Sequence, residues 1–376
     1  MKQVCLLCER SAADQNLYCQ DVRCQAELSP FVLDYGELLG DIEIVKVVVV
    51  QHTATLYEGQ RAGKQIYVKV AHPGAHHTAR LEREAVFLRD LLSQRILGTY
   101  LPSLLPPKLD TTITQHPYGK IAFGRHLLYY YVFAYVPGEP LRDLLKKTPQ
   151  LWINHVGRIA LGMASAVTVL QSKGLLHLGI SPAAVLVHFG PRKQVPQVLL
   201  VDLGLLCTAK TVATHWYADF VAPAYTPPEL LNAAWDAVSY RSDVYGLGLT
   251  LYEMLVGEPA IATRHRSDAE ISEAVRQGWF VPMSRGDDVQ VIPEIAVAAV
   301  KLPRTDSAQT FAQHLAACFK PEPAERQRKR LTLELILVVV VALLVIAFVI
   351  ALLISFGSQA STSALGWDWS LWSRYG

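Results

Sequence analysis

The first third of the chain alternates strand-like and helix-like patterns of apolar positions. Residues 42–50 and 65–70 are rich in β-branched side chains, which favour strands. Residues 78–92 carry apolar positions at helical spacing with charges between them, so they predict an amphipathic helix. A further strand is expected over 127–136, where Pro137-Gly138 ends it.

Helical patterns dominate the sequence beyond this proline and glycine. They cover 155–170, 243–256 and 306–319. A strand-rich part followed by a helical part predicts the α+β class. We therefore expect a bilobal domain over 41–319, with a β-rich small lobe over 41–136, a helical large lobe over 137–319 and a hinge at Pro137-Gly138.

One segment explains the high hydrophobicity of the whole chain. Hydrophobic residues make up 51% of the sequence, and the mean hydropathy is +0.22. The run from Leu335 to Phe356 has no charge and no proline, and as a helix it spans about 30 Å, the thickness of a bilayer core. A buried core helix rarely stays apolar on every face over this length. The sequence therefore predicts a transmembrane helix over 334–356.

The charges that flank this segment predict its orientation. A basic cluster lies at 325–330, within a juxtamembrane linker over 320–333, whereas the tail over 357–376 carries only Arg374 as a cation. Positive charges favour the cytoplasmic side of a membrane. We therefore expect a single-pass protein of the plasma (cytoplasmic) membrane with its large N-terminal part in the cytosol. No signal peptide is recognised at the start of the sequence.

Four of the six cysteines lie close together, at Cys5, Cys8, Cys19 and Cys24. Two close pairs separated by a short hairpin allow four thiolates to converge on a tetrahedral zinc ion. Fewer than about 30 residues cannot bury a useful core, so a structural metal would supply the folding energy. Disulfides are the alternative, and a cytosolic location disfavours them. Residues 1–30 thus resemble a zinc ribbon, a kind of module that often serves for docking.

Charge along the whole chain is nearly balanced. There are 35 Lys and Arg residues against 33 Asp and Glu residues, which gives a formal net charge of +2. This balance gives no reason to expect nucleic acid as a partner. The expected partners are the membrane and a protein that the sequence does not identify.

Short motifs in the middle of the chain occur in the order found in protein kinases. Lys69 follows Tyr67-Val68 on a predicted strand, and Glu84 lies on the helix that comes next. A later apolar strand ends in Asp202-Leu203-Gly204. Residues 41–319 therefore resemble the protein kinase superfamily, in which the matching lysine holds ATP phosphates, the glutamate pairs with that lysine and the aspartate binds Mg²⁺.

The resemblance extends to the segment that joins the lobes. Residues 131–138 are similar to the strand and hinge that grip adenine. By this resemblance Phe133 is the gatekeeper, and the hinge backbone runs from Ala134 through Tyr135 to Val136.

The large lobe carries two further motifs that have structural roles in the family. Pro227-Pro228-Glu229 is similar to the motif that closes the activation segment, and we expect Arg304 to pair with Glu229, with Arg326 as the alternative. Asp243 is similar to the aspartate that braces the catalytic loop.

The catalytic loop departs from the family pattern. Residues 177–184 read His-Leu-Gly-Ile-Ser-Pro-Ala-Ala, and only His177 and the proline match. Gly179 replaces the aspartate that accepts the substrate proton, Ser181 the lysine that steadies the γ-phosphate, and Ala184 the asparagine that binds the second Mg²⁺. No catalytic residue is therefore expected at these positions.

The loop that covers the phosphates in kinases is also altered. Val49, Gln51 and Ala54 stand at its three glycine positions. Glycines there let backbone amides close over the phosphates, whereas side chains at Val49 and Gln51 would crowd this cover.

We interpret the chain as a catalytically impaired kinase-like protein, a pseudokinase, that acts as a membrane-anchored signalling or scaffold module. Two interpretations of the surviving residues stay open. In one, Lys69, Glu84 and Asp202 hold ATP and one Mg²⁺ weakly. In the other, the Lys69–Glu84 pair only locks the helix onto the small lobe, and Asp202 caps the turn that follows it.

Two alternatives belong to other functional classes. A weak or unconventional ATP-dependent Ser/Thr kinase or transferase would need a substitute base, and His188 and His215 lie in suitable regions. A receptor could sense through the tail, although its residues Trp367, Trp369, Trp372 and Tyr375 are typical of interfacial anchors. Thr208, Thr211 and Thr214 lie in the activation segment and are candidate acceptors of phosphate from another kinase.

Overall fold

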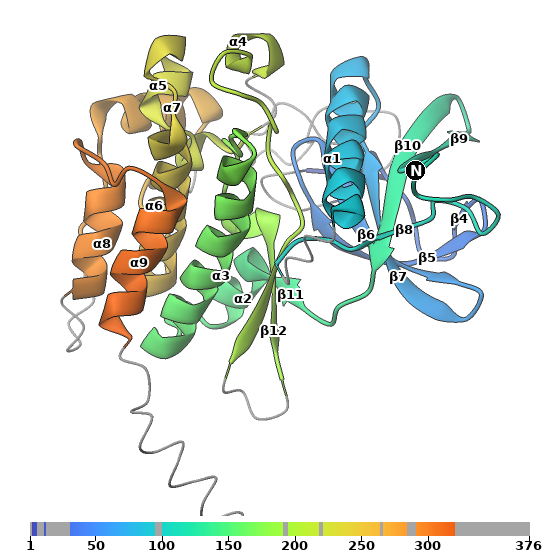
Figure 1. Cartoon of the computed structure of the whole chain (residues 1–376), viewed down its shortest axis with the longest axis horizontal. Helices are drawn as coiled ribbons and strands as arrows, with labels where there is room; N and C mark the ends of the chain where they lie inside the picture. The colour runs from blue at the N-terminus through green and yellow to red at the C-terminus, as the bar shows by residue number, and fades with distance from the viewer. Residues whose placement is uncertain are drawn as a thin grey trace, which may run out of the picture. The chain divides into compact units, whose positions relative to one another are not determined.

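Two lobes, one built on an antiparallel sheet and one on helices, make up most of the chain that the computed structural model describes (Figure 1). The described residues are 2–5, 11–12, 31–94, 100–190, 195–217, 221–263, 266–283 and 291–319. The predicted bilobal α+β fold is confirmed.

The small lobe is a seven-stranded antiparallel sheet with one long helix, α1 (Ala75–Ser93). Its strands are β4 (Leu38–Leu39), β5 (Ile42–Val50), β6 (Ala54–Arg61), β7 (Lys64–Ala71), β8 (Leu104–Leu105), β9 (Gly119–Phe123) and β10 (His126–Ala134). The order is β4-β5-β6-β7-β10-β8, and β9 pairs with β10. The sheet therefore places β7 at its centre, between β6 and β10.

Both faces of this sheet are buried, which explains why its strands are so apolar. Successive side chains of a strand point to opposite faces. On β7, Ile66 and Val68 belong to a buried cluster on the outer face of the sheet. Tyr67 lies on the other face and belongs to the large core that also contains Leu186 and Val201 of the large lobe. The inner face of the small lobe thus packs directly against the large lobe.

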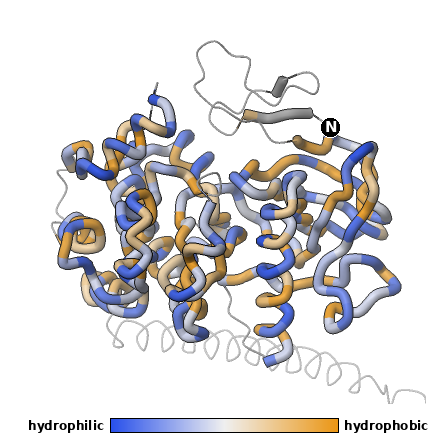
Figure 2. Tube along the Cα trace, turned by 90° about the horizontal axis from the view of Figure 1, so that it is seen from above, coloured by the Kyte–Doolittle hydropathy of each residue, from blue (hydrophilic) through white to orange (hydrophobic). Residues whose placement is uncertain are grey.

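The large lobe begins after β10 with a short three-stranded sheet and continues with helices. Its elements are β11 (Glu139–Pro140), α2 (Leu141–Lys147), α3 (Ile153–Ser172), η1 (Pro182–Ala184), β12 (Val185–Phe189), β13 (Pro196–Leu200), α4 (Val212–His215), η3 (Pro223–Tyr225), α5 (Pro228–Leu231), η4 (Trp235–Ala237), α6 (Tyr240–Val256), α7 (Asp268–Gln277), α8 (Val291–Val300) and α9 (Ala308–Cys318). Helix α6 is buried from Ser242 to Leu255 and packs against α3, α8 and α9. Figure 2 shows hydrophobic and hydrophilic residues alternating along the helical turns, as expected where one side of a helix faces the core.

Within the described residues, α3 is long and apolar enough to cross a membrane by length and composition. Its apolar window is 56% buried inside the protein, and the helix contacts α6, α9 and β13. This pattern is typical of a core helix. The predicted transmembrane helix over 334–356 lies outside the described residues, as do the linker over 320–333 and the tail over 357–376, so these remain predictions.

Three short strands lie near the N-terminus, β1 (Lys2–Val4), β2 (Ser11–Ala12) and β3 (Phe31–Val32). They form an antiparallel sheet in the order β2-β1-β3. Cys5 follows β1 and is buried, whereas Cys8, Cys19 and Cys24 lie outside the described residues. The described part of the chain contains no group of three His, Cys, Asp or Glu side chains that could hold a metal ion. The zinc site therefore stays a prediction.

Candidate functional site

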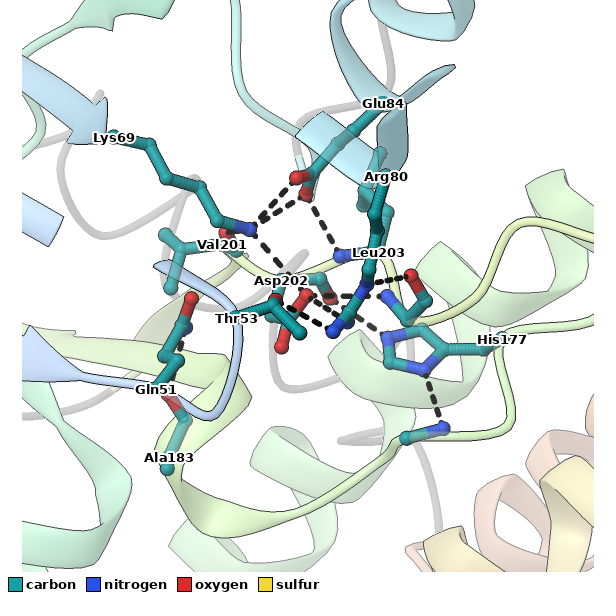
Figure 3. Close-up of polar contacts among 12 residues, drawn as sticks. Gln51, Thr53, Lys69, Arg80, Glu84, His177, Ala183, Val201, Asp202 and Leu203 are labelled. Atoms are coloured by element: carbon teal, nitrogen blue, oxygen red, sulfur yellow. Dashed lines mark hydrogen bonds and ion pairs between the residues drawn. The ribbon is translucent and has the colours of Figure 1, made fainter. Parts of the chain in front are cut away.

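Lys69 on β7 and Glu84 on α1 form a buried ion pair between the sheet and the helix (Figure 3). The Lys69 Nζ atom lies 2.8 Å from both carboxylate oxygens of Glu84. It also donates to the Val201 carbonyl at 3.0 Å and to the Asp202 carboxylate at 3.3 Å. The structure thus brings Lys69, Glu84 and Asp202 together at the junction of the lobes.

Arg80 joins the same cluster, although no sequence motif singled it out. It lies one helical turn before Glu84 on α1, so both side chains share one face. Its guanidinium donates to Asp202 Oδ1 at 2.7 Å, to the Gly204 carbonyl at 2.6 Å and to Thr53 Oγ1 at 2.6 Å. Figure 3 shows the contacts of the guanidinium with Thr53 and Asp202. The sequence feature that could have indicated this position is its spacing of four residues from Glu84, which places both side chains on one face of the helix.

The cluster holds two basic and two acidic side chains, so it carries no net charge. Burial opposes ionisation of Asp202, but Arg80 and Lys69 outweigh this effect and hold the pKa of its carboxyl well below the usual range. Burial raises the pKa of Glu84, and Lys69 opposes that rise. The charges are therefore balanced without any further ion.

Tyr67 lies on the same face of β7 as Lys69, because the two residues are two positions apart. Its hydroxyl donates to the Val136 carbonyl at 2.9 Å. Its ring lies 5.3 Å from that of Phe133, its partner on β10, and 4.9 Å from that of Tyr135. Tyr67 is only 1% exposed. The phenol therefore fills the space between the sheet and the predicted hinge, a role that no pattern in the sequence predicted.

The segment between β5 and β6 is joined to the large lobe through a side chain. Gln51 is buried, and its amide nitrogen donates to the Ala183 carbonyl of the large lobe at 3.2 Å. Burial lowers the pKa of His72 to about 3. The ring is therefore neutral, and its Nε2 lies 2.8 Å from the Gln51 carbonyl. Val49 is also buried, in the core that spans both lobes.

His177 and Asp243 hold the loop that corresponds to the catalytic loop. The Asp243 carboxylate accepts from the backbone amides of His177 and Leu178, at 3.0 Å and 2.8 Å. His177 Nδ1 accepts from the Gly179 amide at 3.1 Å, so its Nε2 carries the proton and donates to the Asp202 carbonyl at 2.7 Å. These bonds fix the loop against the strand end that carries Asp202.

Among the described residues, no carboxylate oxygen is one of the three atoms nearest to the side-chain position of Gly179. A Cβ atom at this position would have Gly204 Cα, Val221 Cγ1 and His177 Nδ1 as its three nearest neighbours, at 3.5, 3.6 and 3.8 Å. Ser181 precedes the short helix η1, and its carbonyl accepts from the Ala184 amide at 3.0 Å. The Ala184 carbonyl accepts from the Val201 amide, and its methyl group offers no ligand atom.

Glu229 of α5 is bound by Arg304, the first of the two predicted partners. Arg304 Nη1 lies 2.6 Å from Glu229 Oε1, and both side chains are largely buried. Ser242 also donates to Glu229 Oε1, at 2.7 Å. Arg326, the alternative, lies outside the described residues. This pair ties the end of the activation segment to the segment before α9.

The two histidines considered as substitute bases lie elsewhere in the large lobe. His188 is near the end of β12, opposite Gln197. His215 is on α4, where its Nδ1 contacts the Thr211 carbonyl at 2.8 Å. Thr208 contacts Thr211 in the same region. Within the described part of the chain, no hydrogen bond or ion pair joins these residues to the cluster around Lys69.

Comparison with known proteins agrees with this arrangement. The family model described as "Protein kinase domain" matches residues 119–337, more than half of the chain. The serine/threonine-protein kinase PknB of Mycobacterium leprae is 29% identical over 167 residues, which cover 43% of this chain and 25% of PknB. The serine/threonine-protein kinase CG17528 of Drosophila melanogaster is 28% identical over 151 residues, 40% of this chain and 20% of that protein. The chain thus matches a quarter or less of the length of these curated relatives.

A solved structure shows the same fold. Rad53 residues 1–466 in complex with AMP-PNP superposes with a TM-score of 0.52 over 73% of this chain and 64% of that chain, at 19% identity. At this identity the likeness establishes the fold alone. From the family match and the two-lobed architecture together, the chain belongs to the protein kinase domain family.

Proposed function

We propose that this chain is a membrane-anchored kinase-fold protein that acts as a signalling or scaffold module and does not transfer phosphate efficiently. The observation that carries the proposal is the surroundings of Gly179. Where a kinase needs an aspartate to accept the proton of the substrate, the nearest described atoms are carbon atoms and a histidine nitrogen that already accepts a hydrogen bond.

Magnitudes support this proposal. Loss of a general base costs about 10²- to 10⁴-fold, so a competent rate of about 1–100 per second would fall to at most about 1 per second. The groups that position and neutralise the γ-phosphate are also replaced, at Ser181 and Ala184. Positioning and charge stabilisation supply most of the catalysis in phosphoryl transfer, so these losses lower the rate further.

Membership of the family suggests ATP and Mg²⁺ as cofactors, and the described residues fit them poorly. Asp202 Oδ1 already accepts from Arg80, Lys69 and the Gly204 amide. The Tyr67 ring occupies the space beside the hinge. The proposed function therefore requires neither cofactor.

The groups that support the fold persist while the chemical groups are replaced. Asp243 braces the loop around His177, and Arg304 binds Glu229. Such a domain presents a rigid surface, and the predicted transmembrane helix would hold that surface near the membrane. This contrast favours a binding role over a catalytic one.

One observation favours the second candidate, an active Ser/Thr kinase. The Lys69–Glu84 pair is intact at 2.8 Å, and kinases require this pair for phosphoryl transfer. The curated relatives are named serine/threonine-protein kinases. An active enzyme would need a substitute base.

Mass spectrometry of the purified full chain in detergent, after incubation with MgATP or MnATP, distinguishes the two candidates. We expect no phosphorylated or adenylylated residue on the chain or on an added generic protein substrate. Modification that disappears in Lys69→Ala and in Asp202→Asn would overturn the proposal. In that case His188→Gln and His215→Gln would show whether either histidine is the base.

A further inference from the structure

We propose that Tyr67 and Arg80 are built-in occupants of the nucleotide cleft. The Tyr67 phenol takes the place of an adenine base, and the Arg80 guanidinium takes the place of a magnesium ion. The two lobes then stay joined without any nucleotide. This inference rests on the proposed function and extends it, because it states how a kinase fold is held in one conformation when no ligand is bound.

Tyr67 makes the ring contacts and the hydrogen bond that the hinge would otherwise offer to a planar ligand. Its ring lies against Phe133 and Tyr135, and its hydroxyl donates to the carbonyl of Val136. Leu56 and Leu186, which belong to the same buried core, are 0% and 3% exposed. Protein interiors are close-packed, so a second ring cannot enter this space unless the Tyr67 side chain leaves it.

Arg80 donates a hydrogen bond to Asp202, whose carboxylate would bind the metal in a kinase. A single oxygen of Asp202 accepts from the guanidinium at 2.7 Å, from Lys69 at 3.3 Å and from the Gly204 amide at 3.2 Å. Arg80 is 3% exposed, and the buried cluster is already neutral with Lys69 and Glu84 included. A divalent cation would add two uncompensated charges in a buried place, which is costly.

These side chains also join the lobes. Thr53 of the small lobe and Gly204 of the large lobe both bind the Arg80 guanidinium. Gln51 binds the Ala183 carbonyl of the large lobe, and Lys69 binds the Val201 carbonyl. Protein hydrogen bonds therefore join the lobes where a kinase would use the nucleotide, and Figure 3 draws those of Gln51, Lys69 and Arg80.

The ring is tested by thermal unfolding of the full chain in detergent with adenosine as the probe. We expect no change in Tm for the wild-type chain at 10 mM adenosine. Tyr67→Ala opens the space for adenosine. If adenosine binds this variant with a Kd of about 1 mM, 10 mM adenosine raises the free energy of unfolding by RT ln 11, which corresponds to a rise in Tm of about 3 °C. Tyr67→Phe is the matched control, since it keeps the ring and should respond no more than wild type.

Tyr67→Leu serves as a second variant if the alanine variant does not fold, because leucine keeps part of the apolar volume. The proposal is contradicted if wild type binds adenosine as well as the alanine variant does. It is also contradicted if a folded alanine or leucine variant gains no stabilisation.

The guanidinium is tested with MgCl₂ and EDTA in the presence of ATP. Wild type should unfold at the same temperature with MgCl₂ as with EDTA. The double variant Tyr67→Ala/Arg80→Gln should be stabilised by Mg²⁺, because the ring has left and Asp202 has lost its closest cation. The double variant Tyr67→Ala/Arg89→Gln is the control, since the Arg89 side chain is 30% exposed and pairs with Asp90 on the same helix. Stabilisation of wild type by MgATP that Lys69→Ala abolishes would overturn the inference.

The outcomes separate this inference from the proposed function. Binding of ATP without any transfer would remove the inference and leave the proposed function standing. An absence of both binding and transfer in wild type, with adenosine binding gained in Tyr67→Ala, supports both.

Discussion

Lys69 and Lys46 are both paired with a glutamate, but they differ in exposure. The Lys69 side chain is 1% exposed and that of Lys46 is 61% exposed. Removing one partner of a buried pair leaves an uncompensated charge, so we expect Lys69→Ala to lower the free energy of unfolding by about 3–5 kcal/mol. Lys46→Ala should cost less than about 1 kcal/mol. Chemical denaturation checks both, and equal losses would show that burial of the cluster is not what stabilises it.

His177 should make stability depend on pH. Burial lowers its pKa to about 4, from an ordinary value of about 6.5. Its contribution is therefore complete above pH 6.5 and is lost as the pH falls toward 4, by up to about 3 kcal/mol in all. We expect His177→Gln to be strongly destabilising at pH 7 and much less so at pH 4.5.

Two buried acids act in the opposite direction over this range. Burial raises the pKa of Asp243 to about 6 and that of Glu253 to about 7. Both remain in the variant, so the difference between wild type and variant isolates His177. A difference that stays constant between pH 7 and pH 4.5 would contradict the assignment of a neutral, buried imidazole.

At the scale of single residues, the sequence predicted that the kinase motif residues lie together, but it did not predict every residue that joins them. Lys69, Glu84 and Asp202 carry motifs whose order implies their proximity, and the structure places them together. Arg80 belongs to no motif, and Tyr67 stands in the strand motif of Lys69 without a role of its own, since a tyrosine on a strand is ordinary. Tyr67 shares a strand face with Lys69, and Arg80 shares a helix face with Glu84. Their contacts also involve the other lobe, so neither position reveals its role when it is taken alone.

At the scale of elements, apolar periodicity predicted the long segments well. The strand expected over 42–50 is β5 with the same bounds, and the helix expected over 78–92 lies within α1. The strand expected over 127–136 ends two residues earlier, at Ala134, because the chain leaves the sheet to form the hinge. Helix α7 was not predicted, although Ser267 and Glu270 form a capping box at its start.

The buried Arg304–Glu229 pair links α5 to the segment before α9. Its contribution to stability can be compared with that of the exposed Arg241–Asp306 pair. The Arg304–Glu229 pair is buried, with side-chain exposures of 5% and 11%, whereas Arg241 and Asp306 are 49% and 72% exposed. We expect Arg304→Ala to cost about 3 kcal/mol or more and Arg241→Ala less than about 1 kcal/mol. Thermal or urea unfolding of both variants measures the difference. Equal costs would mean that this pair does not anchor the activation segment.

For the whole molecule, the main prediction outside the described residues is the anchor. The full chain should remain with membranes after alkaline extraction, because the apolar helix predicted over 334–356 would span the bilayer. A chain that ends at residue 333 should instead appear in the soluble fraction. Immunoblotting of the two fractions checks this, and a full-length chain released by alkaline extraction would contradict the predicted span.

The whole molecule also shows why fold and chemistry can separate. The kinase architecture depends on a core that spans both lobes and on buried pairs such as Arg304–Glu229. None of these requires an acidic side chain at Gly179. The stability of the fold therefore does not depend on the acidic group that phosphoryl transfer uses in kinases.

The most direct test of the central claim is a phosphate-transfer assay with γ-labelled ATP and Mg²⁺ or Mn²⁺ on the full-length chain. We predict that release or transfer of the label will equal that of Lys69→Ala within error. Loss of the base alone would leave a rate between about 10⁻⁴ and 1 per second. A rate in that range that Lys69→Ala and Asp202→Asn both abolish would contradict the account.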